Sequence, residues 1–411
     1  VHSDWTPAEI KSALMLTADT TVLRSDGSTP ADVTDHGAGR VDLTRAARAG
    51  LTLDETHAGF LAANPATGGS PETLNLASLQ HTTCVLTCSW TRTFDATTAD
   101  PTGPTWTVGF TTPSGVSMSA VPSSFGLGAG ASQAVELTID ATGATVGDTI
   151  AAEVRLTPDD GGPVLHLPVW VRVAGHNLPS EVDLVTWDAT GAEPVSGLQV
   201  AEAITALTLV DFGFEEGTRT DVLLSEDPSP DNPYNNLGDV FVKTVTVPLG
   251  ARRIVARTRS AEAPDVDLFM GTGSTPTSGT EQCASTTATA TESCSVEDPA
   301  PGTWWILVQS WAGSASQPDL IELVDGLVPG DTDGSLVTSG PPTVAAGQPF
   351  DVAVAWSLPD PGAATGPSRF FFGAFSVAVD GVSPPVDTVF VNLELIPGLI
   401  FKDGFELGHV G

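Results

Sequence analysis

The sequence predicts a mainly β protein, built from tandem antiparallel β-sandwiches that follow a short segment of two helices. Glycine and proline, 42 and 32 of the 411 residues, separate short runs rich in valine, leucine and threonine, which is typical of sandwich proteins. Apolar residues alternate within those runs, as at Val135, Leu137 and Ile139, so one face of each strand can be buried. Because 411 residues exceed one hydrophobic core, we expect several domains.

The charge of the chain limits its partners. Fifty acidic residues against 16 basic ones give a formal net charge of −34, so nucleic acid would be repelled and is not an expected partner. No run of 18 or more apolar residues occurs, so no membrane span is expected. The chain begins at Val1 without a leader, and we therefore expect a processed product or a fragment.

The four cysteines form two close pairs, Cys84 with Cys88 and Cys283 with Cys294. We expect two local disulfides. Metal binding is the alternative, but it is disfavoured because no further ligands complete a zinc site beside either pair. Disulfides would place the chain in an oxidising compartment. The bridge from Cys84 to Cys88 is expected to constrain one strand and produce a bulge, without joining two sheets.

Only the first 55 or so residues have a helical pattern. Thr6, Pro7 and Glu9 form a capping box with proline at the first helical position, so a helix is expected to start there. A second helix is expected to begin after Asp42 and to end at Gly50.

The residues from Trp5 to Ala18, and from Gly37 to Asp42, resemble the end of the catalytic domain of subtilisin-like serine peptidases, the subtilases. In that family the nucleophilic serine lies in a Gly-Thr-Ser-Met-Ala-type turn, and this chain has no such turn. The resemblance therefore implies that residues 1–55 are the final helices of a truncated catalytic domain, that no catalytic residue is present, and that the partner is a catalytic domain upstream of Val1.

This interpretation has a structural consequence. Apolar side chains that cover a larger hydrolase body should be exposed when that body is missing. The side chains expected to be exposed are Ile10, Leu14, Leu16 and Leu43. The seven histidines are scattered, and His36 beside Asp35 is interpreted as scaffold.

Two further resemblances concern the β region. Residues 56–175, with Asn64-Pro65, Leu74 to Leu79 and Trp90, resemble the fibronectin-III-like domain that follows many subtilase catalytic domains. Residues 176–328 resemble the bacterial pre-peptidase C-terminal domain, through the runs Val245 to Ala251, Asp265 to Phe269 and Pro301 to Val308 with Cys283 and Cys294. Both resemblances imply sandwiches attached to a secreted peptidase.

The second of these regions holds the candidate site residues. An aromatic platform for a polymer or peptide could be formed by Phe269, Trp304, Trp305 and Trp311, although such residues more often belong to a core. Adjacent Trp304 and Trp305 must face opposite sides of a strand, so one of them is expected to be at least partly exposed.

The candidate calcium ligands are Asp265, Asp267, Asp331 and Asp333. The alternative is that these aspartates belong to solvated acidic turns. No cofactor other than calcium is expected. Residues 329–398 are predicted to form a small sandwich or an annex of the preceding one. The tail, residues 399–411, resembles a terminal motif of exported proteins of Gram-negative bacteria, and it is either a sorting address or a last strand.

These observations predict the non-catalytic C-terminal region of a secreted, extracellular serine endopeptidase of the subtilase class, inactive alone. It would stabilise the catalytic domain and hold protein substrate or a surface. The alternative is a secreted adhesion or binding module without enzymatic activity.

Overall fold

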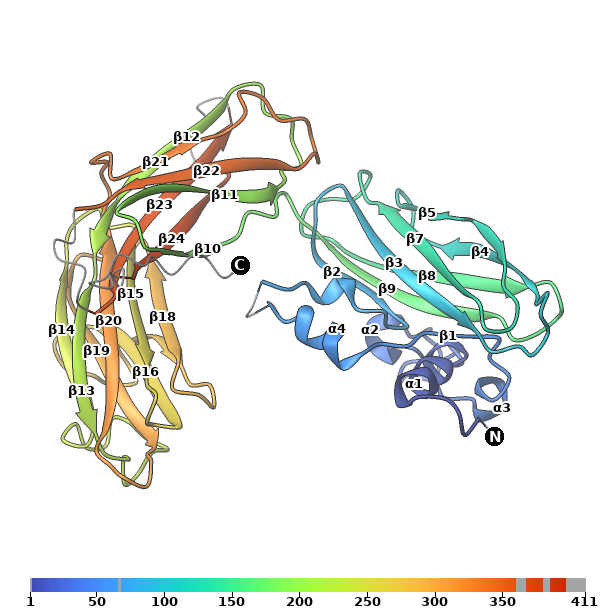
Figure 1. Ribbon diagram of the computed structural model, residues 1–411, viewed down its shortest axis with the longest axis horizontal. Helices are drawn as coiled ribbons and strands as arrows, with labels where there is room; N and C mark the ends of the chain where they lie inside the picture. The colour runs from blue at the N-terminus through green and yellow to red at the C-terminus, as the bar shows by residue number, and fades with distance from the viewer. Residues whose placement is uncertain (1, 66–67, 360–366, 380–384, 397–411) are drawn as a thin grey trace, which may run out of the picture. The chain divides into compact units, whose positions relative to one another are not determined.

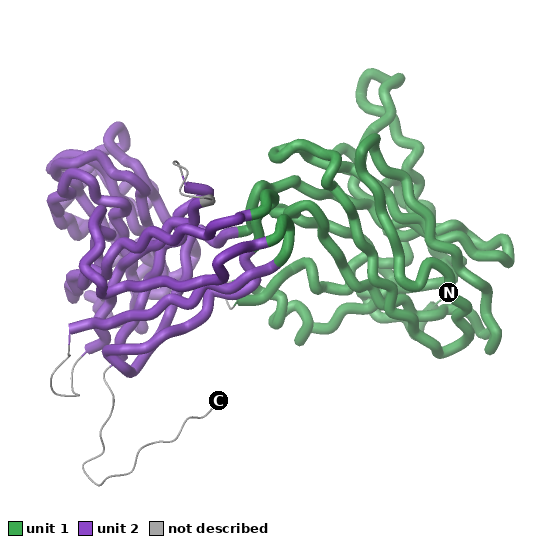
Figure 2. The backbone as a smooth tube through the Cα atoms, turned by 90° about the horizontal axis from the view of Figure 1, so that it is seen from above, with its two compact units in different colours: residues 1–177, 199–203, 345–348 green, residues 178–198, 204–344, 349–411 purple. Residues whose placement is uncertain are grey.

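The computed structural model describes residues 2–65, 68–359, 367–379 and 385–396 (Figure 1). These residues form a mainly β structure of several sheets with four short α-helices, which confirms the predicted fold class. The chain divides into two compact units (Figure 2). Unit 1 comprises Val1–Asn177, Gln199–Ala203 and Ala345–Gln348, and unit 2 comprises Leu178–Leu198, Ile204–Val344 and Pro349–Gly411.

Unit 1 contains two β-sheets. The four-stranded sheet has, in spatial order, β1 (Leu51–Thr52), β3 (Thr87–Ala96), β7 (Ser132–Asp140) and β5 (Ser117–Val121). The five-stranded sheet has β2 (Leu79–Cys84), β9 (Leu165–Val173), β8 (Thr149–Pro158), β4 (Thr105–Thr111) and β6 (Ser124–Gly126). All pairs are antiparallel except β2 with β9. The alternating residues of the two sheets share one core, and Val135, Leu137 and Ile139 are all buried in it.

The helical segment consists of α1 (Pro7–Leu16), α2 (Val33–His36), α3 (Leu43–Ala46) and α4 (His57–Ala62), followed by the 3-10 turn η2 (Pro71–Thr73). The capping box is confirmed, because Thr6 Oγ1 accepts from the Glu9 backbone N–H at 3.1 Å and Glu9 Oε2 accepts from the Thr6 N–H at 2.7 Å. Helix α3 is capped by Asp42 as predicted.

Helix α3 ends at Ala46, however, well before Gly50. A Cβ at Gly50 would lie 2.7 Å from the Trp106 ring, so this glycine permits a close approach to the core of the sandwich. The prediction that Gly50 ends the helix is therefore wrong, and this glycine has a packing role instead.

Helix α1 packs onto the sandwich of unit 1. Ala13 and Leu16 belong to the same core as the strands, and Ser12 Oγ accepts a hydrogen bond from the Leu53 N–H at 2.9 Å. Leu16 is 0% exposed, so the expectation of exposure is wrong for this residue. Ile10 and Leu43 are 44% and 71% exposed, as expected, and Leu14 is half-buried.

The disulfide between Cys84 and Cys88 is confirmed, but its predicted position within a single strand is wrong. Cys84 ends β2 in the five-stranded sheet, whereas Cys88 lies in β3 of the four-stranded sheet. The chain crosses between the sheets at Val85 and Leu86, and Leu86 has a φ of 61°. The bridge therefore links the two layers of the sandwich. The expected irregularity is present in β2, where the register shifts between His81 and Cys84.

Unit 2 contains four sheets. The outer sheet has β14 (Phe241–Val247), β19 (Gly302–Ala312), β16 (Asp265–Thr272) and β17 (Glu281–Ser285). The central sheet has β13 (Thr218–Leu224), β20 (Asp319–Val328), β15 (Arg253–Arg259) and β18 (Glu292–Glu297). Cys283 of β17 and Cys294 of β18 form the second predicted disulfide, which also joins two sheets.

The other two sheets combine strands that are distant in the sequence. One has β10 (Glu181–Thr186), β24 (Asp387–Leu395), β23 (Arg369–Val379) and β12 (Leu207–Glu216). The other has β11 (Thr190–Leu198), β22 (Phe350–Ser357) and β21 (Leu336–Ser339). Strands from the predicted 329–398 segment thus pair with strands that precede the outer and central sheets. The sequence-derived domain boundaries themselves stay a prediction.

The central sheet of unit 2 is covered on both faces. Ile254 and Ala256 of β15 face a core shared with the outer sheet, whereas Val255 between them packs with Phe372 and Phe390. The second interface also contains arginines paired with acids. Arg253 is 3% exposed, and its Nη2 donates to Glu181 Oε2 at 2.5 Å.

Within the described residues, no helix has the length and apolar character that crossing a bilayer requires. The predicted tail motif at 399–411 lies outside the described residues.

Candidate functional site

The outer sheet of unit 2 carries a polar cleft. Asp265, Asp267 and Phe269 alternate along β16 and therefore share a face of the strand. The neighbouring strand, β19, pairs with β16, and its register shifts between Asp265 and Val266, close to Trp311. This irregularity places Trp311 beside the two aspartates, where all three residues line one cleft.

A loop that covers this face explains the positions of the predicted aromatic residues. Gln309 Nε2 on β19 donates to Asp227 Oδ2 at 2.7 Å and to the Pro230 carbonyl at 3.0 Å. The Tyr234 ring meets the Trp305 and Phe269 rings edge-on, at 6.1 and 6.0 Å between centroids. The loop from Asp227 to Val240 therefore closes over the middle of the sheet.

The expectation that Trp304 or Trp305 is partly exposed is wrong. Trp304 packs between the outer and central sheets, and Trp305 lies beneath the loop. Both are buried, and Phe269 is buried with Trp305, whereas Trp311 is 42% exposed. Of the four aromatic residues predicted as a platform, Trp311 is the one that reaches the surface.

The cleft has a volume of about 540 Å³ and combines acidic and apolar walls. Its lining residues are Pro230, Asp231, Pro233, Asp265, Asp267, Phe269, Thr286, Thr287, Ala288 and Trp311. No lysine, arginine or histidine is among them. The cleft is therefore suited to a positively charged group that has an apolar part.

Asp267 is the unusual residue of this cleft. It is 7% exposed, and its carboxylate has no hydrogen-bond or ion-pair partner among the described residues. Burial, and to a smaller extent the nearby Asp265 and Glu292 carboxylates, together raise the pKa of Asp267 to about 7. Burial and Glu292 also raise the pKa of Asp265, whose Oδ1 is buried without a partner in the described structure.

Glu292 provides a contrast in the same place. It is 1% exposed, but it accepts hydrogen bonds from Ser285 Oγ, from the Thr287 hydroxyl and, at 3.1 Å, from the Thr287 N–H. Sequence reasoning missed Glu292, because its approach to Asp267 depends on the packing of β18 against β16.

The other calcium candidates lie elsewhere. Asp333 Oδ1 accepts from the Ser335 N–H at 2.8 Å and from the Ser335 hydroxyl at 2.5 Å, as in a turn, and neither it nor Asp331 lines the cleft. Among the described residues, no group of three or more histidines, cysteines, aspartates or glutamates is placed to hold a metal ion. Calcium binding stays a prediction without such a group to support it.

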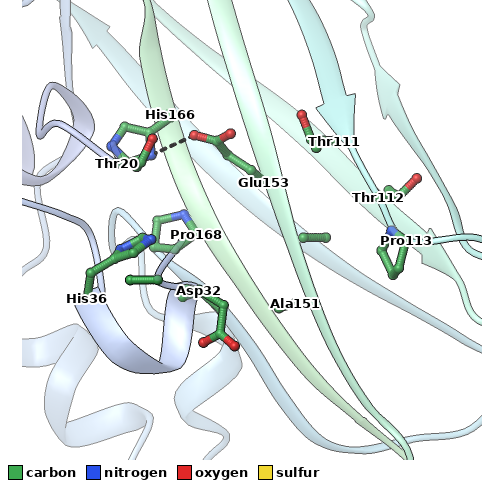
Figure 3. A pocket seen from close by; sticks show the side chains of 13 residues that line it. Thr20, Asp32, His36, Thr111, Thr112, Pro113, Ala151, Glu153, His166 and Pro168 are labelled. Carbon is green, nitrogen blue, oxygen red and sulfur yellow. Dashed lines mark ion pairs between the residues drawn. The ribbon is translucent and has the colours of Figure 1, made fainter. Parts of the chain in front are cut away.

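Unit 1 has a second hollow, of about 380 Å³, between α2 and the strands β8 and β9 (Figure 3). Its polar walls include Asp32 and His36 from the helix and Glu153 and His166 from the strands. His166 Nδ1 lies 3.1 Å from Glu153 Oε1, and Arg155 Nε donates to Glu153 Oε2 at 2.8 Å.

The charges in this hollow are balanced within the chain. Burial acts to raise the pKa of Glu153, but contacts with His166 and Arg155 outweigh it and lower the pKa below its usual value. No serine or cysteine lines the hollow, and His36 Nδ1 lies 3.0 Å from the Gly37 carbonyl oxygen. The arrangement lacks the nucleophile that would make these histidines a hydrolytic site.

Comparison with known sequences identifies a protease-like segment. Over 59 residues the chain is 44% identical to subtilisin-like protease SBT1.3 of Arabidopsis thaliana. The match covers 13% of this chain and 8% of that protein, so the chain spans less than a tenth of the length of this relative. No protein-family profile matches the chain.

Two solved structures that are similar to the chain have low TM-scores. Secreted serine protease VesC from Vibrio cholerae gives a TM-score of 0.20 at 11% identity, covering 62% of this chain and 50% of that one. A protein of unknown function from Porphyromonas gingivalis W83 gives 0.18 at 10% identity, covering 78% and 97%. At these TM-scores the solved structures add nothing to the sandwich architecture described above.

Proposed function

We propose that this chain is the non-catalytic C-terminal region of an extracellular subtilisin-like serine endopeptidase, which stabilises the catalytic domain and holds protein substrate or a surface. The observation that carries the proposal is the 44% identity to a subtilisin-like protease over 59 residues. A segment of that length is close in size to residues 1–55, on which the resemblance to the end of a subtilase catalytic domain rests.

The exposed apolar side chains support a missing partner for the helical segment. Sixteen large apolar residues of the described chain are exposed, and six of them lie within the first 61 residues: Ile10, Leu23, Val41, Leu43, Phe60 and Leu61. This density is more than twice the average for the chain. A high frequency of exposed apolar side chains is typical of a region that takes part in an interface, and an upstream catalytic domain would supply its other side.

Two disulfides and a strongly acidic composition are consistent with secretion. Export from a Gram-negative bacterium, with residues 399–411 as the sorting signal, is part of the proposal.

The stabilising role is tested with two matched substitutions in the longer reading frame that includes the catalytic domain. Leu43→Asp changes an exposed residue of the helical segment, and Leu249→Asp changes one that is 87% exposed in unit 2. We expect Leu43→Asp to lower the yield of active secreted protease about tenfold, since a buried unpaired charge is strongly destabilising, and Leu249→Asp to leave it unchanged. Equal yields from the two variants would contradict the stabilising role.

The absence of catalysis is tested on the purified chain. Neither casein nor a fluorogenic peptide should be hydrolysed above background, because the chain has no subtilase nucleophile turn. Turnover that a serine-directed phosphonate abolishes would overturn this part of the proposal.

A non-enzymatic binding module is the second candidate, and the cleft with Trp311 and the unpartnered Asp267 is the observation that favours it. An upstream reading frame without a serine-centred turn would select this candidate over the protease.

A further inference from the structure

The cleft on β16 and β19 lacks a positive partner that the chain itself could provide. Unit 2 has seven described lysines and arginines, and each lies within salt-bridge distance of a carboxylate outside the cleft: Arg219, Lys243, Arg252, Arg253, Arg257, Arg259 and Arg369. Unit 2 has no described histidine. Within the described part of this unit, no cation remains for Asp267.

A buried carboxylate without a donor is costly, and the surroundings of Asp267 make it more so. Asp265 and Glu292 are its charged neighbours on β16 and β18, and Asp231 adds a carboxylate at the rim. The hydroxyls near Glu292 are already engaged by that residue. A positively charged ligand would offset the desolvation free energy of the Asp267 carboxylate, because it would pair with a group that has no cationic partner within the described part of unit 2.

The other walls of the cleft indicate what kind of cation fits. Trp311, Phe269, Pro230 and Pro233 present apolar surface beside the acids. A divalent metal prefers six or more oxygen ligands and gains nothing from such walls, and the described residues form no metal-holding group. An ammonium or guanidinium on an alkyl stem can pair with a carboxylate while its stem and charge contact an aromatic ring.

We propose that this cleft binds the side chain of a lysine or arginine in a polypeptide, with Asp267 pairing the charged head and Trp311 contacting the stem. The site takes a basic side chain that is exposed on its own polypeptide, since such a side chain can enter a cleft from solvent. This inference goes beyond the protease proposal and does not depend on it, because every residue it uses belongs to unit 2.

The binding test uses the intact chain and three small probes at about pH 8, where Asp267 is ionised and the probes are still charged. The probes are N-acetyl-lysine amide, N-acetyl-arginine amide and the uncharged N-acetyl-norleucine amide, and binding is followed by NMR saturation transfer from the protein to each probe, a signal that every variant retains. We expect both basic probes to bind with dissociation constants on the order of a millimolar, and norleucine at least about tenfold more weakly.

Variants identify the residues responsible. Asp267→Asn should weaken lysine binding about tenfold or more, and Trp311→Ala about three- to fivefold. Glu193→Gln removes an exposed carboxylate of β11 that has no partner in the described structure, and it should leave binding unchanged. Asp267→Asn is not expected to unfold the protein, because it removes a buried charge and keeps the size of the side chain.

The dependence on pH gives a second readout. Asp231 and Asp265 are the other titratable groups that line the cleft, and Glu292 on β18 also acts on Asp267. The covering loop and β17 further carry Asp227, Tyr234, Asp239 and Glu281, and the arginines of β15 pair with carboxylates outside the cleft. Binding of the lysine probe should therefore strengthen about tenfold between about pH 6 and pH 8 in the wild-type chain, and stay flat in Asp267→Asn.

Three results would overturn the inference. Equal binding of the norleucine probe would show that the cleft recognises only the apolar part of the ligand. An unchanged affinity for the lysine probe in Asp267→Asn would show that the Asp267 carboxylate does not pair with the charged head. Binding of Ca²⁺ at Trp311 and Asp267 without binding of either basic probe would identify a metal site. A failed protease assay has no bearing on any of these outcomes.

Discussion

Each unit has a carboxylate that is at least half-buried in a hollow, and the surroundings of the two carboxylates are opposite in charge. In unit 1, Glu153 is paired with His166 and Arg155, and its pKa is lowered. In unit 2, Asp267 has acidic neighbours and no donor among the described residues, and its pKa is raised to about 7. Glu153 is neutralised by residues of its own unit and therefore contributes to stability. Asp267 is not neutralised by a described residue and is therefore available to a positively charged ligand.

The largest expected effect concerns the balanced charge. Glu153→Ala should lower the free energy of unfolding of unit 1 by about 2 kcal/mol at neutral pH, because Arg155 loses its acceptor and the partly buried His166 loses the carboxylate that lies 3.1 Å from its Nδ1. Hydrogen exchange of the β8 and β9 amides measures the loss in the intact chain. Exchange rates equal to those of the wild type would show that the pair does not stabilise the unit.

Removing the unbalanced charge should have the opposite sign. Asp267→Asn is expected to raise the stability of unit 2 by about 1 kcal/mol at about pH 8, because the variant no longer buries an unpaired carboxylate. Exchange of the β16 and β19 amides is the measurement. A loss of stability would mean that Asp267 has a stabilising partner after all.

The two units should also respond differently to acid. Stability from Glu153 is present above its unfolded pKa of about 4.5 and is lost as the pH falls through its lower folded value. For Asp267 the folded pKa lies above the unfolded value of 3.8, so its contribution is complete below about pH 4 and is lost as the pH rises to about 7. Acidification from about pH 7 to pH 5 should therefore raise the protection factors of the β16 amides, which correct exchange rates for their intrinsic dependence on pH, and leave those of β8 unchanged. Parallel changes in both strands would contradict this assignment.

The smallest effect is expected at a carboxylate in neither hollow. Glu193→Gln, on the exposed side of β11, should change stability by less than about 0.5 kcal/mol at any pH between about 5 and 8. A larger change, measured in the same exchange experiments, would mean that the general acidity of the chain, rather than the local environment, controls the other variants.

The sequence predicted those features that depend on local patterns. The capping box at Thr6 and Glu9, the alternation of Val135 to Ile139, and the two cysteine pairs all involve residues close in the chain. The shared face of Asp265, Asp267 and Phe269 likewise follows from the period of a strand.

Features that depend on distant segments were not predictable in this way. Trp305 is buried because the loop from Asp227 to Val240 covers it, and that loop has no periodic pattern. Trp311 lies beside the two aspartates because the pairing of β16 with β19 shifts in register between Asp265 and Val266, and the residue types at these positions do not predict such a shift. Cys84 and Cys88 join two sheets because the chain changes layer between them, and spacing alone cannot show which sheet a strand enters.

The central sheet of unit 2 packs against other strands on both faces, and this limits where the unit can be shortened. Removing β23 and β24 would uncover Val255 together with the guanidinium of Arg253, leaving an apolar and cationic surface on an otherwise acidic protein. Such a surface would attract other copies of the chain and cause precipitation. Shortened forms for crystallisation or display should therefore keep all four sheets of unit 2. A natural gene rearrangement would have to transfer the segments that encode these sheets together.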